Sequence, residues 1–262
     1  MSLARKPARL ACLKLGGALV ASAGLLAASL GDTTPASAGG KSPVVLELFT
    51  SQGCSSCPPA DEYLGELASR HDVIPLAFHV DYWNYIGWTD PYASKEMTKR
   101  QKDYARSLNQ RYVYTPEMVV NGAAQEVGTN RHGIEALIAA AEKAPSDGPK
   151  VDLKFVGADK IRARIGAGSA QAGPATVWLV KFDRPHQTSV EHGENSGKTL
   201  TDYQTVRTFE ELATWTGAPL DLDYAAYDPN DPGDGGCAII VQRDGTGPII
   251  AAAMLKFPPA GS

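Results

Sequence analysis

The chain from residue 43 to about residue 144 alternates between apolar runs and amphipathic segments. The uninterrupted apolar runs predict strands of a sheet covered on both faces, and an apolar stripe on residues 58–69 predicts a helix. The Asn-Gly pair that ends "EMVVNG" predicts a hairpin with "QEVG". Strands are expected at 44–49, 73–80, 117–122 and 125–128, and helices at 58–69, 92–108 and 131–144. The predicted order is β-α-β-α-β-β-α.

After residue 150 the pattern changes to short apolar runs separated by Gly, Pro, Asp and Asn. Such runs are typical of antiparallel strands joined by turns. Strands are expected near 151–156, 160–165, 175–182, 200–209, 237–242 and 249–255. We therefore expect an all-β, sandwich-like domain over residues 150–262, after an α/β domain over residues 43–146.

Residues 1–38 have the pattern of a secretory signal peptide. Four basic residues precede the nearly uncharged run "GGALVASAGLLAASL", and small residues follow in "TTPASAGG". We expect cleavage before Gly39 and export to the periplasm or the extracellular space. The alternative is an uncleaved membrane anchor, but the run is short and rich in Gly, Ala and Ser. No stable membrane insertion is expected after cleavage, because no later segment is long and apolar enough to span a bilayer.

The charge of the chain argues against nucleic acid as a partner. The whole chain has a formal charge of −4, and removal of residues 1–38 takes away four basic residues and one acidic residue, which leaves −7. The remaining sequence has no stripe of Lys and Arg. Nucleic acids and anionic membrane surfaces are therefore not expected partners.

Two cysteines, Cys54 and Cys57, lie between a predicted strand and a predicted helix in "LELFTSQGCSSCPPADEYL". At a helix N-terminus the free N–H groups and the helix dipole favour a thiolate, which makes Cys54 the expected nucleophile. Cys57 then resolves a mixed disulfide, and Pro58 suits the first turn of a helix. The pattern predicts a thiol-disulfide oxidoreductase that acts on protein or small-molecule thiols and disulfides. Its redox centre is the cysteine pair, and it needs no dissociable cofactor.

The order of elements, the CxxC pair and the later string "YTPEMVVNG" together resemble the thioredoxin fold over residues 43–146. The resemblance implies a cis peptide bond between Thr115 and Pro116, opposite the cysteines, with Thr115 presenting a backbone edge to an extended substrate. The string "LELFTSQGCSSC" also resembles the active-site segment of periplasmic disulfide oxidoreductases, with Glu47 in the place of a buried acid. That match implies a role for Glu47 in proton transfer. The alternative is a carboxylate exposed at a strand edge.

A longer resemblance covers almost the whole mature chain. The strings "ELFTSQGCSSCPPAD", "FHVDYWNYIGWTDP", "YTPEMVVNG" and "GENSGKTL" are similar to the secreted bacterial family known as domain of unknown function 1223. That family is grouped with thioredoxin-like proteins and has no established reaction. The expected fold class is therefore an α/β, thioredoxin-like domain followed by an all-β, sandwich-like domain, while the predicted function depends on the residues themselves.

The string "HVDYWNYIGW" places polar and aromatic side chains at the end of a predicted strand, where sites are built in parallel sheets. His79 and Asp81 alternate onto one side of the strand, and Trp83 and Trp88 follow. One interpretation is a wall of the active site, in which His79 or Asp81 carries a proton or binds a ligand and the two Trp side chains contact substrate. The other is an amphipathic loop that packs its rings on the sheet, with His79 hydrogen-bonded in the core.

Two other functions stay open at the level of the sequence. Cys54, Cys57 and His79 are a ligand set that suits copper(I) or zinc, as in a metal-binding chaperone, although a single CxxC is a weak metal signal and no metal is predicted. The other is a non-catalytic binding module with a structural disulfide. Cys237 begins an apolar strand and is expected to be buried, rather than to resolve or crosslink. The sequence specifies neither the direction of electron flow nor the oligomeric state.

Overall fold

The structure is a computed structural model, and it describes residues 42–145, 147–157, 160–170, 172–225, 233–243 and 245–258. All of these belong to one compact unit, Gly39–Ser262. The predicted signal peptide, residues 1–38, lies outside the described residues, so cleavage and export stay predictions. Within the described ranges no helix is long and apolar enough to cross a membrane.

Strands are the most frequent elements of the described chain. The helices are α1 (Pro58–Leu67), α2 (Lys95–Ser107), α3 (Arg131–Lys143) and the 3₁₀ helix η1 (Asp81–Ile86). The strands before residue 130 are β1 (Val44–Thr50), β2 (Val73–His79), β3 (Glu117–Val120) and β4 (Ala124–Val127). The later strands are β5 (Val151–Val156), β6 (Lys160–Ile165), β7 (Ala175–Phe182), β8 (His186–Ser189), β9 (Thr199–Asp202), β10 (Val206–Trp215), β11 (Leu220–Ala225), β12 (Gly236–Arg243) and β13 (Ile249–Lys256).

The fold class expected from the sequence is wrong. An α/β, thioredoxin-like domain followed by an all-β, sandwich-like domain does not fit the residues that the structure describes, of which 41% are in strands and 20% in helices, with the strands in four sheets. Two strands, β8 and β11, have no counterpart among the predicted ones, because their positions alternate between half-buried and exposed and give no apolar run. The structure is a β-rich fold.

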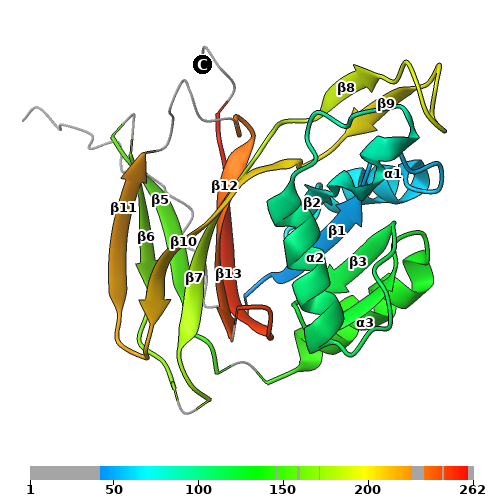
Figure 1. Ribbon diagram of the computed structural model, residues 1–262. Coiled ribbons are helices and arrows are strands. Elements are labelled where there is room, and N and C mark those ends of the chain that lie inside the picture. Colours follow the sequence, from blue (N-terminus) through cyan, green and yellow to red (C-terminus); the bar gives the residue numbers. More distant parts are fainter. Residues whose placement is uncertain are drawn as a thin grey trace, which may run out of the picture. The chain divides into compact units, whose positions relative to one another are not determined.

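The first sheet has the strand order β2-β1-β3-β4. β1 runs parallel to β2 and antiparallel to β3, so the carboxyl ends of β1 and β2 lie at one edge. Alternate residues of β1 separate two apolar cores. Leu46 and Leu48 pack with α1 and α3, whereas Val45 and Phe49 pack on the other face with α2 and with strands of the next sheet. In Figure 1, α2 lies in front of this sheet.

The later strands form two sheets that share a core. The sheets β10-β7-β12-β13 and β11-β6-β5 pack against each other across an apolar cluster to which β6, β7 and β12 contribute. The opposite faces of β7 and β12 place Phe182 and Ile240 in the same cluster as Phe49 of the first sheet. One core therefore joins residues of both predicted domains. The boundaries 43–146 and 150–262 stay predictions.

A hairpin of β8 and β9 forms a sheet of its own, and β9 contacts α1. The loop at residues 190–198 joins its two strands. After β9 the chain returns to the first sheet, where Thr205 forms an isolated bridge with Ala77 of β2 and the Ala77 N–H donates to the Gln204 carbonyl. This return holds the hairpin beside the edge from which α1 begins (Figure 1).

Candidate functional site

The two cysteines lie in the turn that joins β1 to α1, and they form a disulfide. Cys57 is the N-cap of α1, and its N–H donates to the Cys54 carbonyl at 3.2 Å. Proline suits the first helical position, because a backbone N–H there would have no acceptor within the helix and proline has no N–H. The positive end of the helix dipole therefore lies at the cysteines, where it favours a thiolate after reduction. The Cys54 Sγ lies 3.3 Å from the Ser56 Oγ, within hydrogen-bond distance for sulfur.

The loop at residues 190–198, called the covering loop from here on, closes over the disulfide. Asn195 is fully buried, and its Nδ2 donates to the carbonyls of Gln52 at 2.9 Å and Cys54 at 3.0 Å. Both Cys54 and Cys57 are 0% exposed. The cysteines are therefore closed to solvent in this conformation, in which the loop is hydrogen-bonded to the turn that carries them.

A second contact ties the same loop to the cysteine turn. The Glu194 carboxylate accepts a hydrogen bond from the Ser55 N–H at 3.2 Å. Ser55 and Ser56, the two residues between the cysteines, are exposed. The turn therefore presents its serines to solvent while it keeps its sulfur atoms inside.

The segment before β3 lies beside the cysteine turn. The peptide bond between Thr115 and Pro116 is cis, which confirms that part of the prediction. The Thr115 Oγ1 accepts from the Trp83 Nε1 at 2.8 Å. Trp83 also packs against the residue before the first cysteine, because a Cβ at Gly53 would come within 3.1 Å of the Trp83 Cβ. The structure therefore brings Thr115, Trp83 and the cysteine turn together.

Trp88 reaches the same turn through Gln52. The Trp88 Nε1 donates to the Gln52 Oε1 at 3.0 Å, while the Gln52 Nε2 donates to the Asp202 Oδ2 at 2.7 Å. The Gln52 N–H donates to the Asp90 Oδ2 at 2.9 Å. Gln52 is buried, so these bonds satisfy its polar atoms and fix the backbone two residues before Cys54.

His79 ends β2 inside a cluster of carboxyl groups. Its Nδ1 lies 2.8 Å from the Asp90 Oδ2, its Nε2 lies 3.9 Å from the Asp202 Oδ1, and it is 2% exposed. Burial lowers the pKa of His79. The charge and hydrogen bond of Asp90 outweigh burial, together with the charges of Asp202 and another carboxyl group, and the net effect raises the pKa to about 9. Burial also raises the pKa of Asp90, but the charge and hydrogen bond of His79 make the net shift a lowering. His79 is therefore positively charged at neutral pH.

The further carboxyl group near His79 belongs to Asp61, in the first turn of α1. Asp61 follows Cys57 by four residues, so the two side chains are neighbours on one face of the helix. Burial raises the pKa of Asp61 to about 7, while the charge of His79 and the Thr50 hydroxyl oppose the rise. A carboxyl group that exchanges its proton near neutral pH therefore lies one helical turn below the disulfide.

Glu47 has partners of a different kind. It is fully buried in β1, so the alternative of an exposed carboxylate at a strand edge is wrong. Its carboxylate accepts from Arg100 Nε at 2.6 Å, from Arg100 Nη2 at 2.7 Å and from the Tyr104 hydroxyl at 2.7 Å. These partners belong to α2, on the face of β1 opposite α1. The role of Glu47 in proton transfer stays a prediction, and these contacts do not favour it.

Asp81 and His79 do not share a site. The strand ends at His79, and Asp81 begins η1. The Asp81 carboxylate accepts from the Thr98 hydroxyl at 2.6 Å, and the same oxygen of Thr98 accepts from the Asp81 N–H at 3.0 Å. Asp81 therefore attaches η1 to α2, whereas His79 points to the side of α1.

The sequence interpretation missed several buried polar residues of this site. They are Gln52, Asp90, Asn195 and Asp202. Asn195 stands inside "GENSGKTL", a string that the family resemblance had already singled out, and Asp90 stands inside "FHVDYWNYIGWTDP". Motif recognition alone does not tell which residue of such a string faces the cysteines.

The geometry offers little to a metal ion. Among the residues that the structure describes, no group of three or more His, Cys, Asp and Glu side chains is placed to hold one. Both ring nitrogens of His79 face carboxylates, as given above. Cys237 is a buried free cysteine, as predicted, and its Sγ lies 3.3 Å from the Tyr224 hydroxyl. Burial raises the pKa of the Cys237 thiol to about 11, so this thiol stays protonated at neutral pH.

Comparison with known proteins assigns the chain to a family. The family model for the protein of unknown function DUF1223 matches residues 45–242, so the chain belongs to that family. The crystal structure of protein AGR_C_4864 from Agrobacterium tumefaciens is 34% identical, with a TM-score of 0.71, and the match covers 86% of this chain and 99% of that chain. HBP35 of Porphyromonas gingivalis is 16% identical with a TM-score of 0.54, over 85% of this chain and 79% of that chain, a likeness of fold alone. No curated protein matches.

Proposed function

We propose that this member of the DUF1223 family is a thiol-disulfide oxidoreductase. The observation that carries the proposal is the position of the Cys54–Cys57 disulfide at the N-terminus of α1, one helical turn before the carboxyl group of Asp61. A helix N-terminus lowers the pKa of a thiol, and a nearby proton acceptor serves the second thiol. A disulfide that only crosslinks the chain uses neither.

The reaction is an exchange of disulfide bonds. In the reducing direction the Cys54 thiolate attacks one sulfur of a substrate disulfide, the substrate S–S bond breaks, and its other sulfur leaves as a thiolate. The Cys57 thiolate then attacks the Cys54 Sγ, which re-forms the protein disulfide and releases the second substrate thiolate. Two electrons pass from the protein to the substrate. In the oxidising direction a substrate thiolate attacks Cys54 first, and the same steps run in reverse.

Asp61 takes the proton of Cys57 in this scheme. Cys57 must lose its proton before it attacks the mixed disulfide, and Asp61 is its neighbour on the same face of α1. With a pKa of about 7, Asp61 is half ionised at neutral pH and both accepts and returns a proton readily. His79, held by Asp90, is the positive charge that keeps part of the Asp61 population ionised.

The residues around Thr115 form the substrate edge. Trp83 fixes the Thr115 side chain and packs on Gly53, so an extended substrate placed along Thr115 and Pro116 would lie beside Cys54. Trp88 acts one step further away, because its indole holds Gln52 rather than the cysteine turn itself. Trp88 is therefore a positioning residue in this proposal.

The predicted export suits this chemistry. Disulfides form and persist outside the cytoplasm, where protein thiols and small-molecule thiols are the available partners. The covering loop must move before such a partner reaches Cys54, since both sulfur atoms are enclosed. The proposal therefore includes an opening of residues 190–198 before each exchange.

The reduction potential of the cysteine pair tests the proposal. Equilibration with glutathione should give a value between about −120 and −270 mV, the range of catalytic pairs. A potential far more negative than this range would identify a structural disulfide and overturn the proposal. Mixed disulfides give a second test: Cys57→Ser should trap a peptide disulfide on Cys54, and Cys54→Ser should not. Cys237→Ser is the matched control, because its thiol is buried.

The proton transfer has a test of its own. Asp61→Asn keeps the shape of the side chain and removes its ionisation. The rate at which the mixed disulfide resolves should show an inflection near pH 7 in the unaltered chain and lose it in Asp61→Asn. An inflection that persists in Asp61→Asn would assign the proton acceptor to another group.

A further inference from the structure

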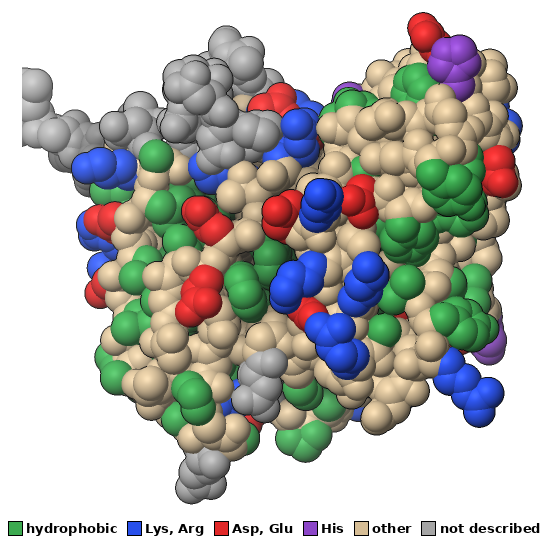
Figure 2. All heavy atoms as spheres, viewed as in Figure 1, with side chains coloured by type: hydrophobic (Ala, Val, Ile, Leu, Met, Phe, Trp, Pro, Cys, Tyr) green, Lys and Arg blue, Asp and Glu red, His purple; other side chains and the backbone are tan. Residues whose placement is uncertain are grey.

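A cavity lies on the α2 side of the molecule. It has a volume of about 640 Å³ and is bounded by α2, by β7 and β10, and by the turn between β12 and β13. Figure 2 shows Lys and Arg side chains gathered over α2, beside a hollow that contains hydrophobic side chains. The volume falls within the range of small-molecule sites. This cavity is separate from the cysteine turn, because it opens on the face of the first sheet opposite α1.

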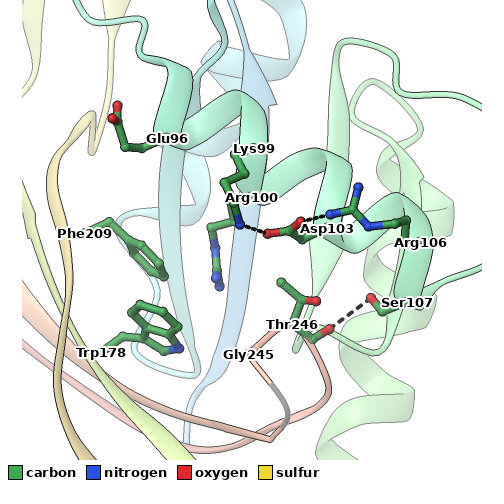
Figure 3. A pocket seen from close by; sticks show the side chains of 10 residues that line it. All are labelled: Glu96, Lys99, Arg100, Asp103, Arg106, Ser107, Trp178, Phe209, Gly245 and Thr246. Carbon is green, nitrogen blue, oxygen red and sulfur yellow. Dashed lines mark hydrogen bonds and ion pairs between the residues drawn. The ribbon is translucent and has the colours of Figure 1, made fainter.

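One wall of the cavity is aromatic. The rings of Trp178 on β7 and Phe209 on β10 stack with centroids 4.5 Å apart and an interplanar angle of 21°. The Arg100 Cζ lies 4.1 Å from the centroid of the Phe209 ring. Figure 3 shows the Arg100 guanidinium directed between these two side chains. The wall offers a flat apolar surface next to a planar cation, which suits a flat aromatic ligand.

The Arg100 side chain leaves one guanidinium nitrogen without a protein acceptor in the described chain. It is 4% exposed, its Nε and Nη2 donate to Glu47, and Nη2 also contacts Tyr104 and Gln242. Its Nη1 has no hydrogen-bond acceptor among the residues that the structure describes. The indole N–H of Trp178, in contrast, is a buried donor without an acceptor in the described ranges. Buried donors are normally satisfied, so an acceptor is missing at this wall.

The rim carries two more cations on α2. Lys99 and Arg106 share the carboxylate of Asp103, with 2.7 Å between the Lys99 Nζ and Asp103, and both side chains are largely exposed. Figure 3 shows this trio above the cavity, and the Glu96 carboxylate pointing away from Arg100. The charges around the cavity are close to balance, so directional donors and ring stacking would decide what binds, rather than net charge.

We propose that this cavity binds a small aromatic carboxylate. The ring of the ligand packs against Trp178, since Phe209 is already covered by Trp178 and Arg100, and the carboxylate accepts from the Arg100 Nη1 and from a cation of the rim. A carboxylate matches the planar fork of a guanidinium, and such charge-assisted bonds are stronger than bonds to a neutral amide. The site does not depend on the redox function, and its failure would leave that proposal untouched.

Calorimetric titration of the full mature chain with 2-naphthoate tests the site, with 2-naphthamide as the neutral counterpart. The amide should bind about tenfold more weakly, because it offers no charged acceptor. Trp178→Leu should weaken the binding of 2-naphthoate about fivefold to tenfold by removing the stacked surface. Arg106→Gln should weaken it about threefold through loss of a rim cation, without a change in the fold.

Lys102→Gln is the matched control, because Lys102 is exposed on α2 and does not line the cavity. It should leave the affinity unchanged. No heat of binding with 2-naphthoate, or equal affinities for the acid and the amide, would overturn the proposal. An equal loss of affinity in Lys102→Gln and Arg106→Gln would also overturn it, since it would show attraction to the helix charge rather than to this cavity.

Discussion

The substitution Asn195→Ala tests whether the covering loop controls access to the disulfide. Asn195 lies 141 residues after Cys54, and its side chain supplies the two buried hydrogen bonds that join this loop to the carbonyls of Gln52 and Cys54. Alanine removes both bonds, so the Gln52 carbonyl loses its Asn195 partner and the Cys54 carbonyl keeps only the bond from the Cys57 N–H in the closed state. We therefore expect the loop to open more often while the rest of the fold stays intact.

The size of the effect follows from these two bonds. A hydrogen bond of this kind contributes about 1 kcal/mol net, so the closed state loses about 2 kcal/mol. Since 1.4 kcal/mol is a factor of ten, the open population should rise about thirtyfold. If a reductant reacts only with the open state, and opening and closing are fast, the rate of reduction follows that population. The disulfide of Asn195→Ala should then be reduced about thirtyfold faster.

Reduction by a water-soluble phosphine, quenched with a maleimide and followed by mass spectrometry, measures this rate. Ser196→Ala is the matched control, because the Ser196 hydroxyl donates to the Glu191 carbonyl within the loop and does not contact the cysteine turn. That variant should react at the rate of the unaltered chain. Equal rates for Asn195→Ala and Ser196→Ala would refute the gating role, provided that thermal unfolding shows both chains to be folded.

Three further predictions concern the groups on either side of β1 and the substrate edge. The raised pKa of His79 contributes about 3 kcal/mol to the free energy of unfolding below about pH 6.5, and this contribution is lost as the pH rises through about 9. Chemical denaturation should therefore show a smaller decrease in the free energy of unfolding over that interval for His79→Gln than for the unaltered chain. Glu47→Gln leaves Arg100 buried without its counter-charge and should lower the free energy of unfolding by about 3 kcal/mol. The pH profile of disulfide exchange should stay unchanged, and an altered profile would support a role of Glu47 in proton transfer. Trp83→Phe and Thr115→Val should each lower the free energy of unfolding by about 1 kcal/mol, because each removes the same hydrogen bond. In a double-mutant cycle the double variant should therefore lose little more than either single variant, and additive losses would contradict the shared bond.

The parts of the molecule that were predicted correctly depend on neighbours in the sequence. The turn at Cys54 and Cys57, followed by a helix that starts with proline, follows from local capping chemistry. The four strands and three α-helices up to residue 144 were also predicted with the right type, although α2 begins at Lys95 rather than at residue 92 and the 3₁₀ helix η1 was not predicted. Ser94, whose side chain accepts from the Met97 N–H, is the cap that sets this boundary.

The parts that were not predicted depend on contacts between distant segments. Gln52 binds Asp202 across 150 residues, and no spacing rule connects them. Glu47 was expected beneath the cysteines because its string resembles the active-site segment of periplasmic disulfide oxidoreductases, yet strand alternation turns it to the other face. To predict these contacts one must know which strands pair and where the chain goes after β9. Hydrophobic periodicity gives neither.

The cysteine site is built from residues of both halves of the chain. His79, Asp61 and the cysteine turn come from the first half of the chain, but Asp202 and Asn195 come from the hairpin that follows β7. A fragment that ended at residue 146 would keep the CxxC pair and lose both the cover of the sulfur atoms and one of the charges around His79. Its cysteines would be open to solvent and the local pKa values would change. The β-rich second half is therefore part of the cysteine site, because it encloses the disulfide and completes the charges beneath it.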